Sequence, residues 1–324
     1  MLTQDNVKRL INLDALTYSG HPDNLADIND ERYQFIHGSI NDYELVETIL
    51  EEEEIDLVLH LAAESHVDRA IHSVEPFLAT NIDGTRSILE AIVNRQRNGQ
   101  TVHLVHVSTD EVYGSLGPSD EPFTETTPLD PRNPYAATKA AADLLVRSFT
   151  NTYGISAVIT RCSNNYGPNQ FPEKLIPLMT LNAFEGKQLP IYGDGMQIRD
   201  WIHVLDHVSG ILTVAHALYG GTCTSGEVFN MGADNEQPNI DIVHRLIELT
   251  NSSKDLIQHV KDRPGHDRRY AMGYQKMEQR FGWKPSHNWD DGLAQTVEWY
   301  RTNDSWIKSV HTGEYRKWID EHYT

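Results

Sequence analysis

Residues 102–114 read VHLVHVSTDEVYG, and residues 133–143 read NPYAATKAAAD. The first segment is a short β-branched run, which predicts a strand, and polar residues follow it at once. The second has the apolar spacing of a helix that continues to residue 153. A strand that ends in polar residues before a helix is typical of an α/β sheet, whose functional groups collect at the carboxyl ends of the strands.

The same alternation extends through the first half of the chain. Further strands are predicted at 7–13, 33–36, 55–61 and 155–160, and further helices at 43–53 and 76–94. This order predicts an α/β fold with a doubly wound, Rossmann-type parallel sheet that has helices on both faces. After residue 162 the alternation weakens and Gly and Pro become frequent, which indicates a second, smaller α/β domain.

The expected dinucleotide-binding Rossmann domain spans residues 1–161, and residues 199–220 return to it as a strand and a helix. The expected substrate domain comprises residues 162–198 and 221–324. Between the two quoted segments, residues 114–134 form a long polar loop. A loop of this length is more often functional than structural, so we expect a flap over the active site.

The first strand of such a sheet is missing from this sequence. Asp14 ends a predicted strand and suits the acidic residue that binds an adenosine ribose, but only 13 residues precede it and none is glycine. The absent strand and its glycine-rich phosphate turn would be central, so its neighbours should stand about 10 Å apart. Three explanations stay open: a misassigned or shortened start, a decayed and inactive copy, or another segment that fills the slot.

Tyr135 and Lys139 are four residues apart at the start of a helix, so their side chains share one face. An ammonium beside a phenol favours the phenolate, which can take a proton from a sugar hydroxyl. Ionisation near neutrality requires a shift of roughly 3 units, about 4 kcal/mol. That is more than one lysine supplies, so a cationic cofactor ring or desolvation should contribute. Asp110 and Glu111 add a second acid/base pair.

Charge and composition limit the partners. A formal charge of −20 over 324 residues argues against nucleic acid and anionic membranes. The two cysteines, Cys162 and Cys223, lack metal spacing, and the chain has neither an 18-residue apolar run nor a signal-peptide core, which favours a cytoplasmic location. His203 and His207 have helical ligand spacing without a third ligand nearby in sequence, so we expect no metal site.

Several motifs together carry a resemblance to a known family. HLAAESHVDRAI (60–71), STDEVYG (108–114), SNNYGP (163–168), PEKLIP (172–177) and RPGHDRRY (263–270) resemble the dTDP-glucose 4,6-dehydratases, which are extended short-chain dehydrogenases/reductases. The similarity extends from Leu13 to the carboxyl terminus. Tyr-x-x-x-Lys alone is weak, whereas Thr-Asp-Glu joined to the other motifs is specific. The departure is the amino terminus, where the family has the strand and glycine turn.

The resemblance implies a three-step reaction with NAD. Tyr135, assisted by Lys139, would take the C4 hydroxyl proton as hydride leaves C4. Glu111 would then remove the C5 proton while Asp110 protonates the departing C6 hydroxyl, and hydride would return to C6. Thr109 would hydrogen-bond near the C4 oxygen. The product would be dTDP-4-keto-6-deoxyglucose, in a route such as that to rhamnose.

The resemblance also implies two sets of binding residues. For NAD they are Asp14, Ser39, Ile40, Leu61, Ala62, Ala63, Thr80, Ser108, Tyr135 and Lys139. For the nucleotide sugar, dTDP-glucose, they are Ser65, His66, Asn164, Lys174, Leu175, Pro190, Tyr192, Arg199, Asn230, Arg263, His266 and Tyr323.

A homodimer is the expected assembly, because in the resembled family the helices at 76–94 and 135–153 pair with their symmetry mates as a four-helix bundle. Two other functions stay open. One is a nucleotide-sugar epimerase or decarboxylase, which Asp110 and Glu111 disfavour. The other is an inactive remnant that does not turn over, which the missing phosphate turn would explain.

Overall fold

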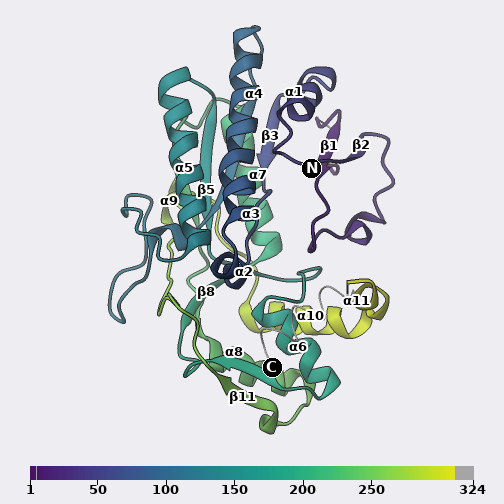
Figure 1. Ribbon diagram of the computed structural model, residues 1–324, viewed down its shortest axis with the longest axis vertical. Helices are drawn as coiled ribbons and strands as arrows, with labels where there is room; N and C mark the ends of the chain where they lie inside the picture. The colour runs from purple at the N-terminus through teal and green to yellow at the C-terminus, as the bar shows by residue number, and fades with distance from the viewer. Residues whose placement is uncertain (5, 311–324) are drawn as a thin grey trace.

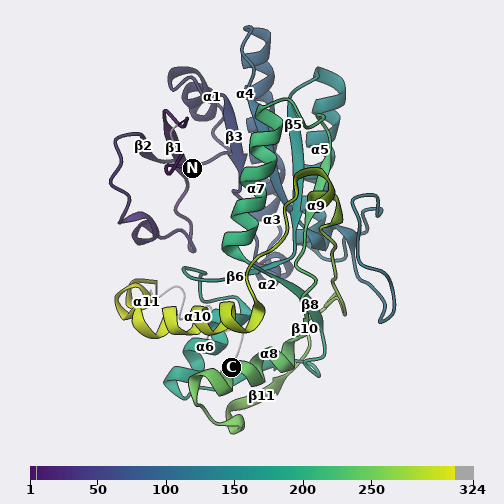
Figure 2. The ribbon, with the colours of Figure 1, turned by 180° about the vertical axis from the view of Figure 1, so that it is seen from behind.

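A four-stranded parallel sheet forms the centre of the computed structural model, which describes residues 1–4 and 6–310. Its order is β3-β4-β5-β9, with bounds Leu57–His60, His103–Thr109, Ala157–Cys162 and Val228–Met231. Figure 1 shows α4 (Thr85–Arg97) and α5 (Pro134–Tyr153) in front of the sheet, and Figure 2 shows α7 (Val204–Tyr219) on its other face. The prediction of a doubly wound parallel sheet is confirmed.

Burial on both faces follows from the alternation of side chains along each strand. Leu104 and Ile159 belong to the core under α1 (Tyr43–Glu52), α4 and α5, whereas Val105 and Val158 belong to the core under α7. All four side chains are fully buried. The short β-branched runs are therefore explained as strands with a helix layer on each side.

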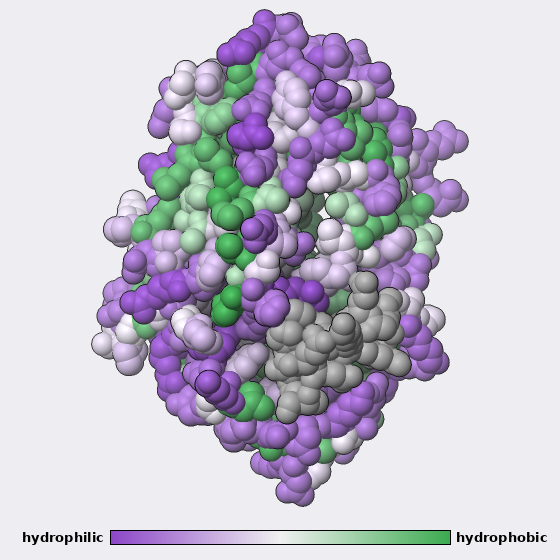
Figure 3. Space-filling model, in the orientation of Figure 1, coloured by the Kyte–Doolittle hydropathy of each residue, from purple (hydrophilic) through white to green (hydrophobic). Residues whose placement is uncertain are grey.

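A second, two-stranded parallel sheet stands apart from the first. β1 (Leu10–Asp14) pairs with β2 (Tyr33–His37), and Figure 1 shows both beside β3 without joining it. Within residues 1–4 and 6–310, no strand pairs with the second edge of β1 or of β3. The predicted interruption is thus confirmed, and the alternative in which another segment fills the slot is wrong for the described chain. Figure 3 shows the surface hollowed next to this region.

The amino-terminal residues are held at the amino ends of β1 and β2. The Arg32 guanidinium donates to the carbonyls of Gln4 and Val7 at 3.1 and 2.9 Å. The Gln4 side chain also lies 2.9 Å from a ring nitrogen of His216 on α7. These contacts connect the two-stranded sheet to the helix that covers the four-stranded one.

The predicted helices are present with small changes. α1 is Tyr43–Glu52, while the stretch at 76–94 is divided into α3 (Glu75–Phe77), a π-turn (Leu78–Gly84) and α4. In the π-turn the Asn81 amide bonds the backbone N–H and C=O of Glu64 at 2.9 and 3.0 Å. This buried side chain attaches the turn to the end of β3, and π-turns of this kind are frequent at functional sites.

Most of the remaining elements form a second α/β region below the first in Figure 1. One sheet has the order β10-β8-β6, and another pairs β11 with β7. The strand bounds are β6 Asn164–Tyr166, β7 Leu189–Tyr192, β8 Ile198–His203, β10 Glu236–Pro238 and β11 Ile257–Val260, and the helices of this region are α6 Leu175–Glu185, α8 Asn239–Thr250, α10 Trp289–Thr302 and α11 Asp304–Val310.

Two further helices pack on the first region. α2 (Val67–His72) lies against α5, and α9 (Gln275–Phe281) lies against β9. Short 3-10 turns are found at Pro22–Leu25, Asp110–Tyr113 and Lys254–Leu256.

The return of the chain to the main sheet differs in part from the sequence expectation. Helix α7 does pack on the four-stranded sheet, but β8 pairs with β6 and β10 instead of joining it. The fourth strand of the main sheet is β9, which lies in the segment expected to be substrate domain. Short strands of similar composition cannot be assigned to one sheet or another without the tertiary contacts.

The loop predicted as a flap is attached at several points to the main sheet and to the second region. Backbone N–H groups of Leu116 and Phe123 donate to the carbonyls of Arg269 and Ala271 at 2.9 and 2.8 Å. The Glu125 carboxylate accepts from the backbone of Asn230 at 3.0 Å. The loop therefore forms a fixed wall in this structure.

Candidate functional site

The end of β4 and the start of α5 bring the expected catalytic residues together. Thr109 ends β4, Asp110 and Glu111 open the 3-10 turn after it, and Tyr135 and Lys139 lie in the first two turns of α5. All except Glu111 are buried, and Asp110 is only 2 % exposed. The Thr109 hydroxyl donates to the Asp110 carboxylate at 3.2 Å, and Thr109 also lies close enough to the Tyr135 phenol to lower its pKa, so a sugar hydroxyl could reach both groups.

Lys139 is directed toward the sheet backbone. Its ammonium donates to the carbonyl of Val107 at 2.8 Å. Burial lowers the pKa of Lys139 to about 8, although Asp143, one turn further along the helix, acts in the opposite direction. The lysine thus has a proton that it can lose close to neutral pH.

The Tyr135 phenol is protonated in this environment. Its pKa is raised well above the usual value, chiefly by burial and then by the negative charge of Glu111. The expectation that desolvation would help form the phenolate is therefore wrong, because burial disfavours the charged form of a phenol. The sequence suggested two factors that could lower the pKa of Tyr135, a cationic cofactor ring and desolvation. Of these, only the positive charge of a cofactor ring would lower it.

The two adjacent carboxyl groups lie in different surroundings. Burial, followed by the charges of Glu111 and Asp200, raises the pKa of Asp110 well above its usual value. Glu111 is less buried and accepts a hydrogen bond from the Asn133 amide at 3.0 Å. Asp110 can therefore hold a proton to donate, while Glu111 is placed as an acceptor.

Asp200 was not identified from the sequence as a site residue. It is fully buried and accepts backbone N–H groups of Ala233 and Asn235 at 2.9 and 2.7 Å. Burial raises its pKa to about 6. Its motif, Arg199-Asp200, was visible, but that both charges act on Asp110 depends on the path of β8.

The expected diphosphate-binding residues gather on the second region. Arg199 is buried over the ring of Tyr270 at 4.2 Å, and its guanidinium donates to the carbonyls of Ile198 and Asp267 at 2.8 and 3.0 Å. Arg263 of the second region donates to Asp68 of α2, on the Rossmann side, at 3.2 Å. His266 packs edge-on against Tyr192, with ring centroids 5.9 Å apart. The charges of Arg263 and Arg199 both act on His266, so two guanidinium groups and an imidazole lie close to one another.

A second set of contacts joins helix α2 to the start of α6. The Lys174 ammonium donates to the carbonyl of Ser65 at 2.8 Å, and a His66 ring nitrogen lies 3.8 Å from the Glu173 carboxylate. Burial lowers the pKa of His66 to about 3. Leu175 begins α6, Pro190 lies in β7 and Asn164 begins β6. The expected sugar and base residues therefore lie on several elements around one interface.

Two expected substrate residues are not found in this group. The Asn230 side chain is fully buried, where it accepts from the Tyr113 hydroxyl at 2.8 Å and donates to the Phe123 carbonyl. In this conformation it is not available to a diphosphate, because its amide is already used inside the protein. Tyr323 lies outside the described residues.

The expected cofactor residues lie on both sides of the gap in the sheet. Asp14 is the last residue of β1, and Ser39 and Ile40 follow β2. Leu61, Ala62 and Ala63 follow β3, and Leu61 is 55 % exposed. Thr80 lies in the π-turn. The Ser108 hydroxyl at the end of β4 is buried without a hydrogen-bond partner, as a ligand-binding group would be. These residues fit the two ends of a dinucleotide, but the described chain has no glycine-rich turn for its pyrophosphate.

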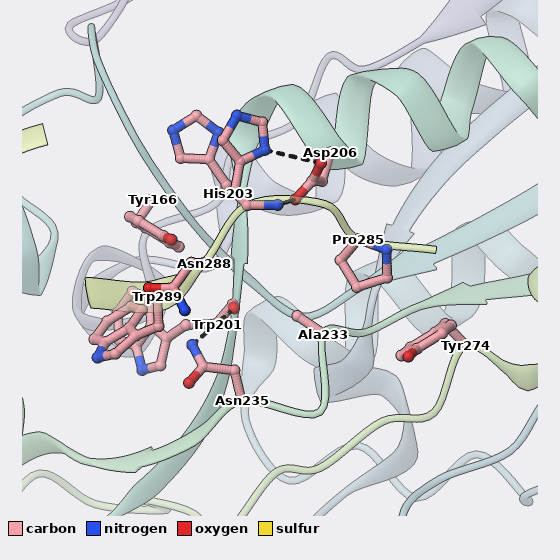
Figure 4. A pocket seen from close by; sticks show the side chains of 11 residues that line it. Tyr166, Trp201, His203, Asp206, Ala233, Asn235, Tyr274, Pro285, Asn288 and Trp289 are labelled. Atoms are coloured by element: carbon pink, nitrogen blue, oxygen red, sulfur yellow. Dashed lines mark hydrogen bonds and ion pairs between the residues drawn. The ribbon is translucent and has the colours of Figure 1, made fainter. Parts of the chain in front are cut away.

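A cavity of about 270 Å³ lies elsewhere and includes none of the predicted site residues (Figure 4). His203 and His287 stack at its edge with ring centroids 4.0 Å apart, and His287 bonds Asp206 at 2.9 Å. His203 accepts from the backbone of Leu205 as the cap of α7, and His207 bonds Asn165 at 2.9 Å. Both histidines of the helical pair therefore have structural contacts.

A parallel sheet with Thr-Asp-Glu at a strand end, beside Tyr-x-x-x-Lys on the next helix, defines an extended short-chain dehydrogenase/reductase. Residues 1–296 match the family model described as GDP-mannose 4,6 dehydratase. A dTDP-glucose 4,6-dehydratase of Escherichia coli K12 is 46% identical over 99% of this chain and 92% of its own, and one from Xanthomonas campestris is 46% identical over 95% and 90%. The chain belongs to the family of dTDP-glucose 4,6-dehydratases.

Solved structures show the same similarity. The dTDP-glucose 4,6-dehydratase of Streptomyces venezuelae, solved with NAD, is 42% identical with a TM-score of 0.88 and covers 94% of this chain and 91% of its own. A UDP-glucose 4-epimerase of Thermotoga maritima is 28% identical with a TM-score of 0.81, over 90% and 91%. The epimerase shares the fold but fewer of the residues.

Proposed function

We propose that this chain dehydrates dTDP-glucose to dTDP-4-keto-6-deoxyglucose. The observation that carries the proposal is the convergence of Thr109, Asp110 and Glu111 at the end of β4 with Tyr135 on α5. An epimerase that only oxidises and reduces C4 has no use for a protonated and an accepting carboxyl side by side. The identity of 46% to a curated dehydratase supports the same reaction.

Tyr135 takes the proton of the C4 hydroxyl. NAD, when bound, supplies a cationic ring that accepts hydride from C4 and later returns it to C6. Its positive charge is also the contribution that the buried Tyr135 requires, because burial alone raises the pKa of the phenol. Lys139 lies on the second turn of α5 and has a pKa of about 8. Its ammonium therefore offsets the change in charge at Tyr135 and the cofactor ring.

Elimination of water uses the two carboxyl groups. A C4 ketone acidifies the C5 hydrogen, and Glu111 removes that proton. The electron pair forms the C5–C6 double bond as the C6 hydroxyl leaves with a proton from Asp110. The raised pKa of Asp110, caused mainly by burial, supports its role as the acid. Reduction at C6 and protonation at C5 complete the product.

The diphosphate is bound by charged side chains of the second region. Arg199, Arg263 and His266 supply the donors, and bidentate arginine contacts suit phosphate oxygens. Arg263 now donates to Asp68 at 3.2 Å, so a diphosphate has to share or replace that contact. Lys174, Leu175, Pro190 and Tyr192 enclose the nucleoside end. The proposed division of labour is a Rossmann part for NAD and a second region for the nucleotide sugar.

The position of NAD follows from the two groups of cofactor residues. Asp14 holds the adenosine ribose, while Thr80, Ser108 and the Tyr135–Lys139 pair surround the nicotinamide end. The Ser108 hydroxyl, buried without a partner, supports this assignment. Without a glycine-rich turn in the described chain, affinity for the pyrophosphate depends on the wall formed by Leu61–Ala63.

A homodimer fits the outer face of the Rossmann part. Leu144 on α5 is 54 % exposed, and Leu78 before α4 and Tyr153 at the end of α5 are also exposed. Figure 3 shows hydrophobic residues gathered over this side. We propose that two copies pair through α4 and α5 as a four-helix bundle. We also propose that the protein acts in the cytoplasm, in deoxysugar synthesis such as that of rhamnose. Within residues 1–4 and 6–310, no helix is long and apolar enough to cross a membrane.

Incubation with dTDP-glucose and NAD tests the function. The expected product is a 4-keto sugar, which absorbs in alkali. An epimerised sugar without any keto product would reject the proposal in favour of the epimerase. For the inactive remnant the test is a calorimetric NAD titration, and the absence of heat at millimolar cofactor would favour that alternative.

A further inference from the structure

Asn133 connects the proposed general base to the helix of the proposed phenol. It lies at the position before α5 and is only 7 % exposed. Its side-chain oxygen accepts the backbone N–H of Ala136 at 2.9 Å, and its side-chain nitrogen donates to the Glu111 carboxylate at 3.0 Å. One amide group thus uses both of its ends, on two different parts of the site.

Capping alone does not explain an asparagine here. Ser, Thr and Asp cap helices about as well, because they too offer an oxygen to the first turn. Asparagine differs because the same side chain also offers N–H donors. Among the described residues, this amide is the only hydrogen-bond donor to the Glu111 carboxylate. The choice of residue therefore matches the second contact.

We propose that Asn133 is a positioning residue for the elimination step. By bonding one oxygen of Glu111, it sets the plane of the carboxylate and leaves the second oxygen for the C5 proton. Because its other end caps α5, the base and the Tyr135 phenol keep a fixed separation. This inference rests on the proposed function, in which the two groups act on neighbouring carbons of one hexose.

Asn133→Ser separates the two contacts, since serine keeps the cap and loses the donor. The rate of C5 hydrogen exchange with deuterated water should fall by about 10- to 100-fold, as expected for losing a hydrogen bond to a charged group. The rate of C4 oxidation, followed by the absorbance of reduced nicotinamide in a single turnover, should change less than threefold. Asn288→Ser is the matched control, because Asn288 caps α10 in the same way, 3.2 Å from the N–H of Asp291, away from the site.

Asn133→Asp gives a second, independent readout. It also preserves the cap, but it places another carboxylate where the donor was. The acid limb of the pH profile for C5 exchange should move to higher pH by about one unit, because like charges at this distance disfavour ionisation. Thermal unfolding of each variant reports whether the fold is preserved.

The outcomes separate the two proposals. If the unmodified chain makes no keto sugar, the function is wrong. If it does, equal losses in C4 oxidation and C5 exchange for Asn133→Ser would mean that Asn133 only caps the helix, and the positioning role would be overturned. C5 exchange equal to that of Asn288→Ser, with no shift in the pH profile for Asn133→Asp, would overturn it as well.

Discussion

The four-stranded and the two-stranded sheets differ in how completely they are built. β4 and β5 have a parallel neighbour on each side and side chains buried on both faces, and the proposed catalytic residues begin at the last residue of β4. β1 and β2 are only partly buried, and Asp14, the residue proposed to bind the ribose, is the last residue of β1. In the proposed function, the chemistry is therefore carried by the complete part of the fold, and the nucleotide end of the cofactor is bound by the incomplete part.

The physical basis of the difference is the number of neighbours. A two-stranded sheet alone is marginally stable and depends on packing against other elements. Here Leu13 of β1 supplies that packing, since it contacts the core under α1, α4 and α5. We expect the catalytic constellation to be rigid and the region of β1 and β2 to open at lower free energy.

The largest effect is expected at Glu111. Glu111→Gln should slow elimination by about 10²- to 10⁴-fold, the usual contribution of a general base, because an amide cannot take the C5 proton. C4 oxidation should persist, so reduced cofactor should accumulate in a stopped-flow single turnover. Glu121→Gln, in the exposed part of the long loop, is the charge-matched control. Undiminished dehydration by Glu111→Gln would contradict the role of the base.

A matched pair of leucines tests the contrast in stability. Leu104→Ala in β4 should cost about 2–5 kcal/mol, because the side chain is fully buried. Leu10→Ala in the partly buried β1 should cost about 1 kcal/mol. Urea unfolding gives both values. Equal losses would mean that the two sheets form one cooperative unit despite the gap.

Binding of NAD should depend on residues of the Rossmann part, and binding of the nucleotide sugar on residues of the second region. Asp14→Ala should weaken NAD binding by about 10- to 100-fold and leave the nucleotide sugar unaffected, because it removes a charged hydrogen-bond acceptor from the ribose. Arg263→Gln should show the reverse, by a similar factor. Calorimetric titrations with each ligand measure both. If either variant weakened both ligands equally, the proposed division of the site would be incorrect.

The smallest effect concerns the pH dependence of stability and His207 on α7, the helix that covers the four-stranded sheet. Burial lowers the pKa of His207 to about 4, so the unfolded chain, with a value near ~6.5, binds more protons between these limits. His207 alone should therefore lower the free energy of unfolding by roughly 1 kcal/mol over the first pH unit below about 6.5. His207→Gln should make the slope in urea titrations shallower by that amount, while the other buried histidines, such as His66, keep their share. An unchanged slope would assign the acid sensitivity to those other groups.

The sequence predicted the elements that depend on local pattern. The strand before Thr109, the helix predicted from residue 135 and the interruption next to Asp14 were all visible, because β-branched runs, helical apolar spacing and a missing glycine turn are local signals. The placement of β8 outside the main sheet depends on tertiary pairing, so it was missed. The burial of Asn230 and the raised pKa of Tyr135 were missed for the same reason, since both depend on what surrounds them.

The most direct test follows one deuterium atom through the reaction. dTDP-glucose that carries deuterium at C4 should give a keto product with deuterium at C6, because hydride leaves and returns within one site. In a separate reaction in deuterated water, the C5 position should acquire deuterium from the solvent through Glu111. NMR of the product reports both positions. Loss of the C4 label to solvent, or a labelled sugar epimerised at C4 with its C6 hydroxyl intact, would contradict the account.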